Sequence, residues 1–258
     1  MVSAESKIGG AMCRLVEETS GHETMKFLGP GCLASFPNVQ FLHSVGTPKS
    51  NSFLVASNQV LTKSHLRAIK NQDKEKSKRR KPSVKIVAEF LGTKENLERR
   101  PLGDLYRSFD DDVFELNGVI YVALTKLEGR FSKSSLLNRT LEASSFVQAR
   151  AFSSDQLQCL VFCEERTREE TSAVFSTRAY DLLPFDSVLA ADDSRFPSYF
   201  LRSEEKKRYL KEDEFEQCEK LLGAVLVSKD RYHVVGFLNF FNKTPAPALF
   251  GTETGKFA

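Results

Sequence analysis

Short runs of β-branched and aromatic residues recur along most of this chain, and turn residues separate them. Such runs predict β-strands, because these side chains favour an extended backbone. The predicted strands are residues 39–45, 52–56, 59–62, 84–91, 113–116, 119–127, 146–152, 157–163, 172–178, 224–228 and 233–240. Asn117-Gly118, between two of these runs, is typical of a tight hairpin. Many short strands at this spacing favour an all-β sandwich or barrel.

The same runs predict the apolar core. We expect seven apolar residues of the predicted strands to be buried. They are Leu54, Val60, Ile86, Val122, Leu124, Leu226 and Val235. Helical patterns are rarer. The clearest covers residues 203–222, where Ser203 can cap the first turn and Gly223 follows the last apolar pair as a C-cap. A second, short helix is expected near Met12–Glu18.

Composition is that of a globular chain. The sequence has 258 residues, 41% hydrophobic and 28% charged, which suffices for one large domain or two small ones. No apolar run approaches the roughly 20 residues that cross a bilayer, and the first residues lack the apolar stretch of a signal peptide. Five cysteines, an odd number, indicate reduced thiols. We therefore expect a cytoplasmic or nuclear protein without a membrane partner.

The cysteines do not form a metal-binding pattern. Cys159 and Cys163 are four residues apart in an apolar run, and one such pair is half of what a structural zinc site needs. None of the four histidines forms a second pair with them. We expect buried structural thiols here, and neither a metal nor another cofactor.

Charge is concentrated in one polar segment, residues 70–81, which ends at Pro82. We expect this segment to be a solvated loop between two strands, because it has nothing apolar to bury. Its basic patch consists of Lys76, Lys78, Arg79, Arg80 and Lys81. A charged loop tip, a nuclear-import signal and a phosphate-binding patch are all compatible with this run.

Residues 53–66 read as two short strands with a turn at Ser57-Asn58 and His65 at the far end. The segment resembles the one that carries the catalytic histidine of trypsin-like (chymotrypsin-fold) serine proteases, in which Phe-Leu-Val, a turn and Val-Leu-Thr-x-x-His follow one another. The resemblance implies an all-β fold of two six-stranded antiparallel barrels, with an inserted helix near 203–222. The implied division is an N-terminal extension (1–25), a first barrel (26–135), a second barrel (136–245) and a C-terminal tail (246–258).

The other two members of the protease triad are missing at the matching positions. Residues 121–127, Tyr-Val-Ala-Leu-Thr-Lys-Leu, resemble the family's Asp-Ile-Ala-Leu-Leu-Lys-Leu, with Tyr121 in place of the aspartate. Asp112 is an alternative source of that carboxylate. The serine motif matches near Gly223, and Leu222 stands where the nucleophile is expected. Without both groups, His65 has no partner with which to run acyl-transfer chemistry, so we interpret it as a relic.

The resemblance therefore predicts a catalytically inactive protease-like domain that binds a protein or peptide. In the family, the strand matching residues 234–241 pairs with extended substrate, so Phe237, Asn239 and Phe241 are the candidate peptide-binding residues. Two alternatives stay open. One is an unorthodox serine or cysteine endopeptidase that uses His65 with Cys218 or another nucleophile. The other is a nucleic-acid-associated factor that binds through the basic loop 74–81.

Overall fold

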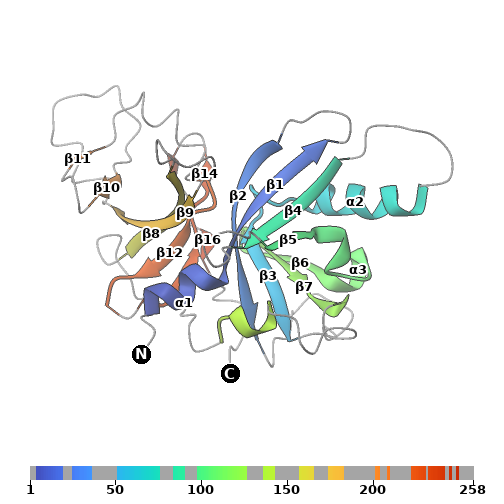
Figure 1. Ribbon diagram of the computed structural model, residues 1–258, viewed down its shortest axis with the longest axis horizontal. Coiled ribbons are helices and arrows are strands. Elements are labelled where there is room, and N and C mark those ends of the chain that lie inside the picture. The colour runs from blue at the N-terminus through green and yellow to red at the C-terminus, as the bar shows by residue number, and fades with distance from the viewer. Residues whose placement is uncertain are drawn as a thin grey trace.

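Two antiparallel β-sheets dominate this protein (Figure 1). The computed structural model describes residues 4–19, 25–36, 51–75, 84–90, 98–126, 136–142, 157–165, 174–182, 201–203, 208–209, 222–230, 232–241, 244–245 and 248–249. Each large sheet has seven strands in these ranges, whereas the sequence predicted six in each barrel. The predicted all-β class is confirmed, because helices are few and every strand pairing is antiparallel.

The first sheet is built from the N-terminal half of the chain. Its strands, in spatial order, are β5 (Glu98–Pro101), β4 (Val84–Phe90), β1 (Met12–Thr19), β2 (Met25–Ser35), β3 (Ser52–Ser57), β7 (Val119–Ala123) and β6 (Val113–Leu116). The hairpin between β6 and β7 turns at Asn117-Gly118, as predicted, and both residues have positive φ, 49° and 79°. Such a backbone is the one that an Asn-Gly turn accommodates.

The second sheet comes from the C-terminal half. In spatial order it contains β11 (Arg208–Tyr209), β10 (Leu201–Ser203), β9 (Val174–Leu182), β8 (Leu157–Glu165), β12 (Val225–Ser228), β13 (Val234–Phe237) and β16 (Ala248–Leu249). A separate pair is formed by β14 (Phe240–Phe241) and β15 (Thr244–Pro245). The predicted strands at 157–163, 172–178, 224–228 and 233–240 therefore exist, with shifted ends.

Helices lie at the margins of the sheets. They are α1 (Ala4–Ala11), α2 (Lys63–Glu75), α3 (Phe109–Asp112) and the 3-10 turns η1 (Leu102–Asp104) and η2 (Leu137–Arg139). Figure 1 shows α2 on the side of the first sheet that faces away from the second sheet. In the part of the chain that the structure describes, no helix combines the length and the apolar character that a membrane crossing requires.

One continuous apolar core joins the two sheets. Leu160, Val225, Val234 and Phe237 of the second sheet belong to the same buried cluster as the interior of the first sheet. All seven core residues that the sequence predicted are at most 2% exposed. Burial of this shared core stabilises both sheets together, because it removes apolar surface of each from water.

The structure corrects the start of the chain. Residues 12–18 are not a helix but most of β1, which lies between β2 and β4 and pairs with both. The first sheet therefore begins at Met12, not at residue 26. Two full ladders of backbone hydrogen bonds outweigh the weak local preference of this segment for a helix.

Two further elements differ from the prediction. Residues 59–62 are a turn leading into α2, because the Ser57 carbonyl accepts hydrogen bonds from the backbone N–H groups of Val60 and Leu61. The predicted helix at 203–222 does not begin at Ser203, which pairs with Arg208 between β10 and β11. Pairing with β9 outweighs the helical pattern there. The predicted strands 39–45 and 146–152 lie outside the described residues, as do positions 210–221.

Candidate functional site

His65 lies in the first turn of α2. The Thr62 hydroxyl accepts a hydrogen bond from the His65 backbone N–H at 3.1 Å, and the Leu66 N–H donates to the Thr62 carbonyl at 3.2 Å. Thr62 thus acts as the N-cap of the helix. The buried Leu66 then anchors this turn, and its carbonyl accepts a hydrogen bond from the Tyr106 hydroxyl at 2.9 Å. The position of His65 is therefore well defined by its neighbours in the chain.

In the part of the chain that the structure describes, the imidazole of His65 has no orienting partner at Nδ1. Its ring is half-buried, and its Nδ1 is buried without a hydrogen-bond partner among the described residues. In a serine-protease triad this nitrogen donates to a carboxylate, which holds the ring in the productive tautomer. Leaving a buried polar atom unpaired costs about 1–3 kcal/mol. The described part of the chain therefore contains no orienting group for His65.

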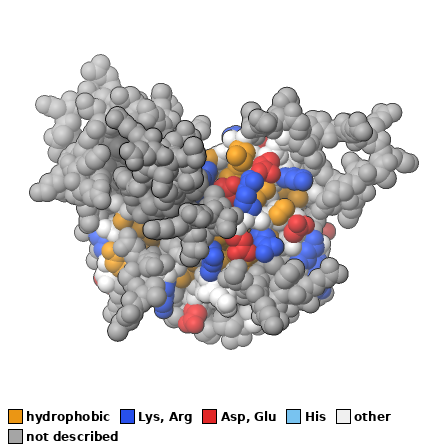
Figure 2. All heavy atoms as spheres, viewed as in Figure 1, with side chains coloured by type: hydrophobic (Ala, Val, Ile, Leu, Met, Phe, Trp, Pro, Cys, Tyr) orange, Lys and Arg blue, Asp and Glu red, His pale blue; other side chains and the backbone are white. Residues whose placement is uncertain are grey.

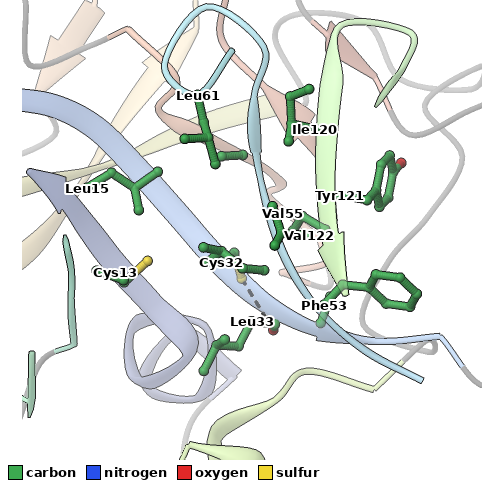
Figure 3. Close-up of a cluster of buried hydrophobic side chains, with 14 of the residues drawn as sticks. Cys13, Leu15, Cys32, Leu33, Phe53, Val55, Leu61, Ile120, Tyr121 and Val122 are labelled. Atoms are coloured by element: carbon green, nitrogen blue, oxygen red, sulfur yellow. Dashed lines mark hydrogen bonds between the residues drawn. The ribbon is translucent and has the colours of Figure 1, made fainter. Parts of the chain in front are cut away.

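Tyr121 is an aromatic core residue. It lies in the middle of β7, opposite Val55 and Phe114 on the neighbouring strands, and it is only 1% exposed. Its ring is edge-on to the rings of Phe36 and Phe53, at centroid distances of 6.3 and 6.4 Å. Figure 3 shows the Tyr121 and Phe53 rings on the same side of these strands. Burial raises the pKa of the Tyr121 phenol well above its usual value, so it supplies no negative charge.

Asp112 is committed to holding a turn together. Its Oδ2 accepts three hydrogen bonds, from the backbone N–H groups of Arg107 and Ser108 at 2.8 and 2.9 Å and from the Thr125 hydroxyl at 2.8 Å. The residue is 3% exposed. A carboxylate is useful at this position because it pairs backbone N–H groups that would otherwise be buried without an acceptor. Asp112 thus ties α3 to the end of β7 and does not pair with His65.

The described part of the segment around Leu222 begins at that residue, and the Gly223 N–H in it is used inside the fold. The Gly223 N–H donates to the Leu238 carbonyl at 2.7 Å, and the Leu238 N–H donates to the Ala224 carbonyl at 2.8 Å. An oxyanion hole needs N–H groups that are directed at the substrate. The Gly223 donor is instead used inside the fold, next to an apolar, half-buried Leu222.

Phe237 and Asn239, two of the predicted peptide-binding residues, are both buried in the fold. Phe237 is fully buried, and its strand is paired with β12 on one side and with β16 on the other. That edge is therefore closed to an added strand at Gly236 and Phe237. The Phe241 backbone pairs with Thr244, and its side chain lies outside the described part of the structure.

Asn239 belongs to a polar junction between the two sheets, which we define as Ser57, Asn58, Gly118 and Asn239. The Ser57 hydroxyl donates to Asn239 Oδ1, and Asn239 Nδ2 donates to Asn58 Oδ1 at 3.2 Å and to the Gly118 carbonyl at 3.5 Å. Asn58 also donates from its backbone N–H to the Gly118 carbonyl at 2.8 Å. Sequence reasoning identified Ser57-Asn58 and Asn117-Gly118 only as turns. Both turns contain an asparagine, whose side-chain amide can form hydrogen bonds. This was the signal in the sequence that could have indicated a contact between the two turns.

The remaining candidates divide between the described and the undescribed residues. Residues 70–75 belong to α2 and are not the predicted loop, whereas Lys76, Lys78, Arg79, Arg80 and Lys81 lie outside the described ranges, as does Cys218. Cys159 is buried, as predicted, and desolvation raises its pKa to about 12. Among the described side chains, no group of three or more potential ligands is placed to hold a metal ion.

Comparison with known proteins adds distant similarities to solved structures. No protein-family model matches this sequence, and no curated protein matches it. Among solved structures, a catalytically inactive tobacco etch virus protease complexed with substrate has 11% identity and a TM-score of 0.40, over 95% of this chain and 80% of the protease. Deg5 has 9% identity and a TM-score of 0.42, over 95% of this chain and 86% of Deg5. At these scores neither similarity assigns a fold family or a function to the chain.

Proposed function

We propose that this chain is a catalytically inert, trypsin-like protease domain that acts by binding a protein or peptide partner. The observation that carries the proposal is the buried Nδ1 of His65, which has no hydrogen-bond partner among the described residues. A histidine without an orienting group is a poor general base, because neither its tautomer nor its ring orientation is controlled.

The neighbouring positions support the same conclusion. Tyr121 is neutral and packed into the core, Asp112 Oδ2 accepts three hydrogen bonds from its own surroundings, and the Gly223 N–H is bonded to Leu238. Each of these three groups is used to stabilise the fold. Chemistry would require several of these contacts to break together.

A binding role draws support from the outer face of the first sheet. Met25 is 64% exposed there, and its sulfur accepts a hydrogen bond from Arg99 at 3.7 Å. Nearby, the Arg14 guanidinium lies 5.5 Å from the centre of the Phe27 ring. Figure 2 shows that hydrophobic side chains and charges of both signs are intermingled on the described part of one face of the molecule. Methionine, arginine and aromatic residues in such a mixture are typical of protein-binding surfaces.

The inert state is tested with the purified chain and its His65→Ala variant. We expect neither protein to hydrolyse casein or fluorogenic peptides, and neither to react stoichiometrically with a fluorophosphonate. Cleavage by the natural chain that disappears in His65→Ala would overturn the proposal. Labelling of Cys218 by iodoacetamide that depends on His65 would instead support the cysteine endopeptidase alternative.

The binding role is tested by proximity labelling in cells. We expect a Met25→Ser, Arg99→Gln double variant to lose specific neighbours that the natural chain and a Lys7→Gln control both retain. Lys7 is an exposed cation on α1, which leads into Met12 opposite Cys32 at the other end of β2 from Met25, so it matches the loss of one positive charge away from this face. Identical neighbour profiles for all three proteins would exclude this face as the binding surface.

A further inference from the structure

Met25 is the one large apolar side chain that is exposed among the residues that the structure describes. It is the first residue of β2 and lies opposite Glu18 of β1. The other described methionine, Met12, is completely buried at the start of β1. Oxidation of a side-chain sulfur depends on its exposure, so dissolved oxidants can reach Met25 and not Met12 in the folded protein.

The sulfur of Met25 has a cationic neighbour that is fixed in position. Arg99 Nη2 donates a hydrogen bond to Met25 Sδ at 3.7 Å and another to Glu18 Oε1. Arg99 Nε donates to Glu89 Oε1 at 2.9 Å, and the Glu89 side chain is only 7% exposed. Carboxylates on β1 and β4 thus hold the guanidinium plane. Because a terminal guanidinium nitrogen carries two hydrogens, Nη2 can serve Glu18 and the sulfur at once.

Oxidation of Met25 would strengthen its contact with Arg99. The sulfur of a thioether is a weak acceptor, whereas the sulfoxide is polar and presents an oxygen. Hydrogen bonds from a charged donor to oxygen are shorter and stronger than those to neutral sulfur. An N···O distance of about 2.9 Å is reached by a small rotation of the Met25 side chain, which its exposure permits. Arg99 therefore favours the oxidised side chain over the reduced one.

The position of Arg99 also gives the reaction a handedness. In oxidation by hydrogen peroxide, a sulfur lone pair attacks one peroxide oxygen and the O–O bond breaks. The departing hydroxide takes the proton left on the transferred oxygen, so the products are the sulfoxide and water. Sulfur loses two electrons and the peroxide gains them. The guanidinium approaches the sulfur from one side and stabilises the charge that develops on the departing oxygen there, so one of the two sulfoxide epimers should predominate.

We propose that Met25 is a site of oxidation by peroxides, at which Arg99 receives the sulfoxide oxygen and selects one epimer. The modification makes the one exposed large apolar side chain of the described residues polar, and it engages an Arg99 N–H in a stronger bond. Its effect on a bound partner rests on the proposed function, since Met25 belongs to the proposed binding face. The oxidation itself does not depend on that function.

The proposal is tested by treating the full chain with dilute hydrogen peroxide at neutral pH and following each methionine by peptide mass spectrometry. In the folded protein we expect Met25 to oxidise about tenfold faster than Met12 or more, and after unfolding in urea we expect similar rates. The epimers are counted on the digested peptides with the two classes of methionine sulfoxide reductase, each of which reduces one epimer, and dithiothreitol as reductant. One class should reduce about three quarters or more of the Met25 sulfoxide from the folded chain. The two classes should reduce equal shares from the unfolded chain.

Arg99→Gln and Arg100→Gln are the matched variants. Each removes one guanidinium from β5, but Arg100 is bonded to Glu98 at 2.9 Å and lies on the opposite face of the strand from Arg99. We expect Arg99→Gln to give nearly equal epimers and Arg100→Gln to keep the natural ratio. If Arg99→Gln does not fold, the comparison of the folded with the unfolded natural chain decides.

Three results would overturn the proposal. One is equal amounts of the two epimers from the folded natural chain. Another is a bias that survives in a folded Arg99→Gln protein, because the selection would then come from another group. The third is oxidation of native Met12 as fast as that of Met25.

Discussion

Burial fixes the chemical state of Tyr121. Its ring is packed against Phe36 and Phe53, and a phenolate there would lose its hydration. The pKa of the phenol is accordingly raised well above its usual value by desolvation. Tyr121 is therefore an uncharged packing residue at every pH from acid to moderately alkaline, whatever group a related protein holds at the matching position.

Changing Tyr121→Asp should not restore an active site. The substitution removes a buried ring and places a carboxylate among apolar neighbours, so we expect a loss of about 4 kcal/mol or more in the free energy of unfolding. Tyr121→Phe keeps the ring and should cost about 1 kcal/mol or less. Urea unfolding followed by circular dichroism measures both. A stable Tyr121→Asp protein with His65-dependent peptidase activity would contradict this account.

The buried thiols should be inert in the folded protein. Desolvation raises the pKa of Cys32 and of Cys159 from about 9 to about 12. A raised folded-state pKa means that the stability from each neutral thiol is fully present below pH 9 and is lost as pH rises toward 12. At pH 8 iodoacetamide should therefore modify Cys13, Cys32 and Cys159 only after unfolding in urea, as measured by peptide mass spectrometry. Modification of native Cys32 at the rate of a free thiol would disprove its burial.

Among the elements, the turn after β3 packs between the two sheets. The Val60 side chain in this turn lies between Gly29 of β2 and Gly223 ahead of β12. A Cβ atom added to either glycine would overlap Val60 Cγ2. Gly223 also has a φ of 75°, which side chains rarely tolerate. The two glycines, far apart in sequence, thus form a socket for one valine.

Gly223→Ala should destabilise the protein by about 2–4 kcal/mol, through the positive φ and through overlap with Val60. Val60→Ala should also be destabilising, because it leaves a cavity. In the double variant the overlap is relieved, so we expect the combined loss to be smaller than the sum by about 1 kcal/mol or more. A double-mutant cycle in urea measures this difference. Strict additivity would show that Val60 does not occupy the socket.

For the whole molecule, the polar junction and the shared core make the two sheets one cooperative unit. Asn239 is 6% exposed and connects the end of β13 to Ser57, Asn58 and Gly118 of the first sheet. Around this junction the apolar cluster runs from one sheet into the other without interruption. Relative motion of the sheets would break hydrogen bonds and expose apolar surface at once.

Asn239→Ala should lower the free energy of unfolding by about 2–3 kcal/mol, because it removes the hydrogen bonds that link Asn239 to the buried Ser57 hydroxyl, to Asn58 and to the Gly118 carbonyl. Unfolding should remain a single transition, since the apolar core still couples the sheets. Hydrogen exchange of amides in β3 and β12, followed across a urea series, tests both statements. Separate transitions for the two strands would indicate independent domains. Lys85→Ala, at an exposed position, is the control and should change stability by less than about 0.5 kcal/mol.

Local patterns predicted the β class, about half of the described strands and the seven named core residues, but they missed β1, β2 and β5 of the first sheet. β-Branched and aromatic side chains favour an extended backbone whatever the rest of the chain does. The bounds of β3, β4, β6 and β12 were therefore predicted to within a few residues. The hairpin at Asn117-Gly118 was also correct, because a positive φ is a local property of those residues. The predicted strand at residues 59–62 was wrong, because these residues form the turn before α2. Val60 and Leu61 are buried from this turn, so their apolar side chains resemble those of a strand in the sequence.

The order of residues along the chain is thus sufficient for the fold class and for the seven predicted core positions, since each depends on residue type and near neighbours. Other properties arise only when distant segments meet. Several features of the structure depend on how segments far apart in sequence come together. They are the hydrogen bonds of Asn239, the socket around Val60, the pairing of β13 with β16, and the surroundings of His65 Nδ1, which has no described partner. Hydrogen bonding and close packing act through space, so these contacts came from the tertiary structure alone.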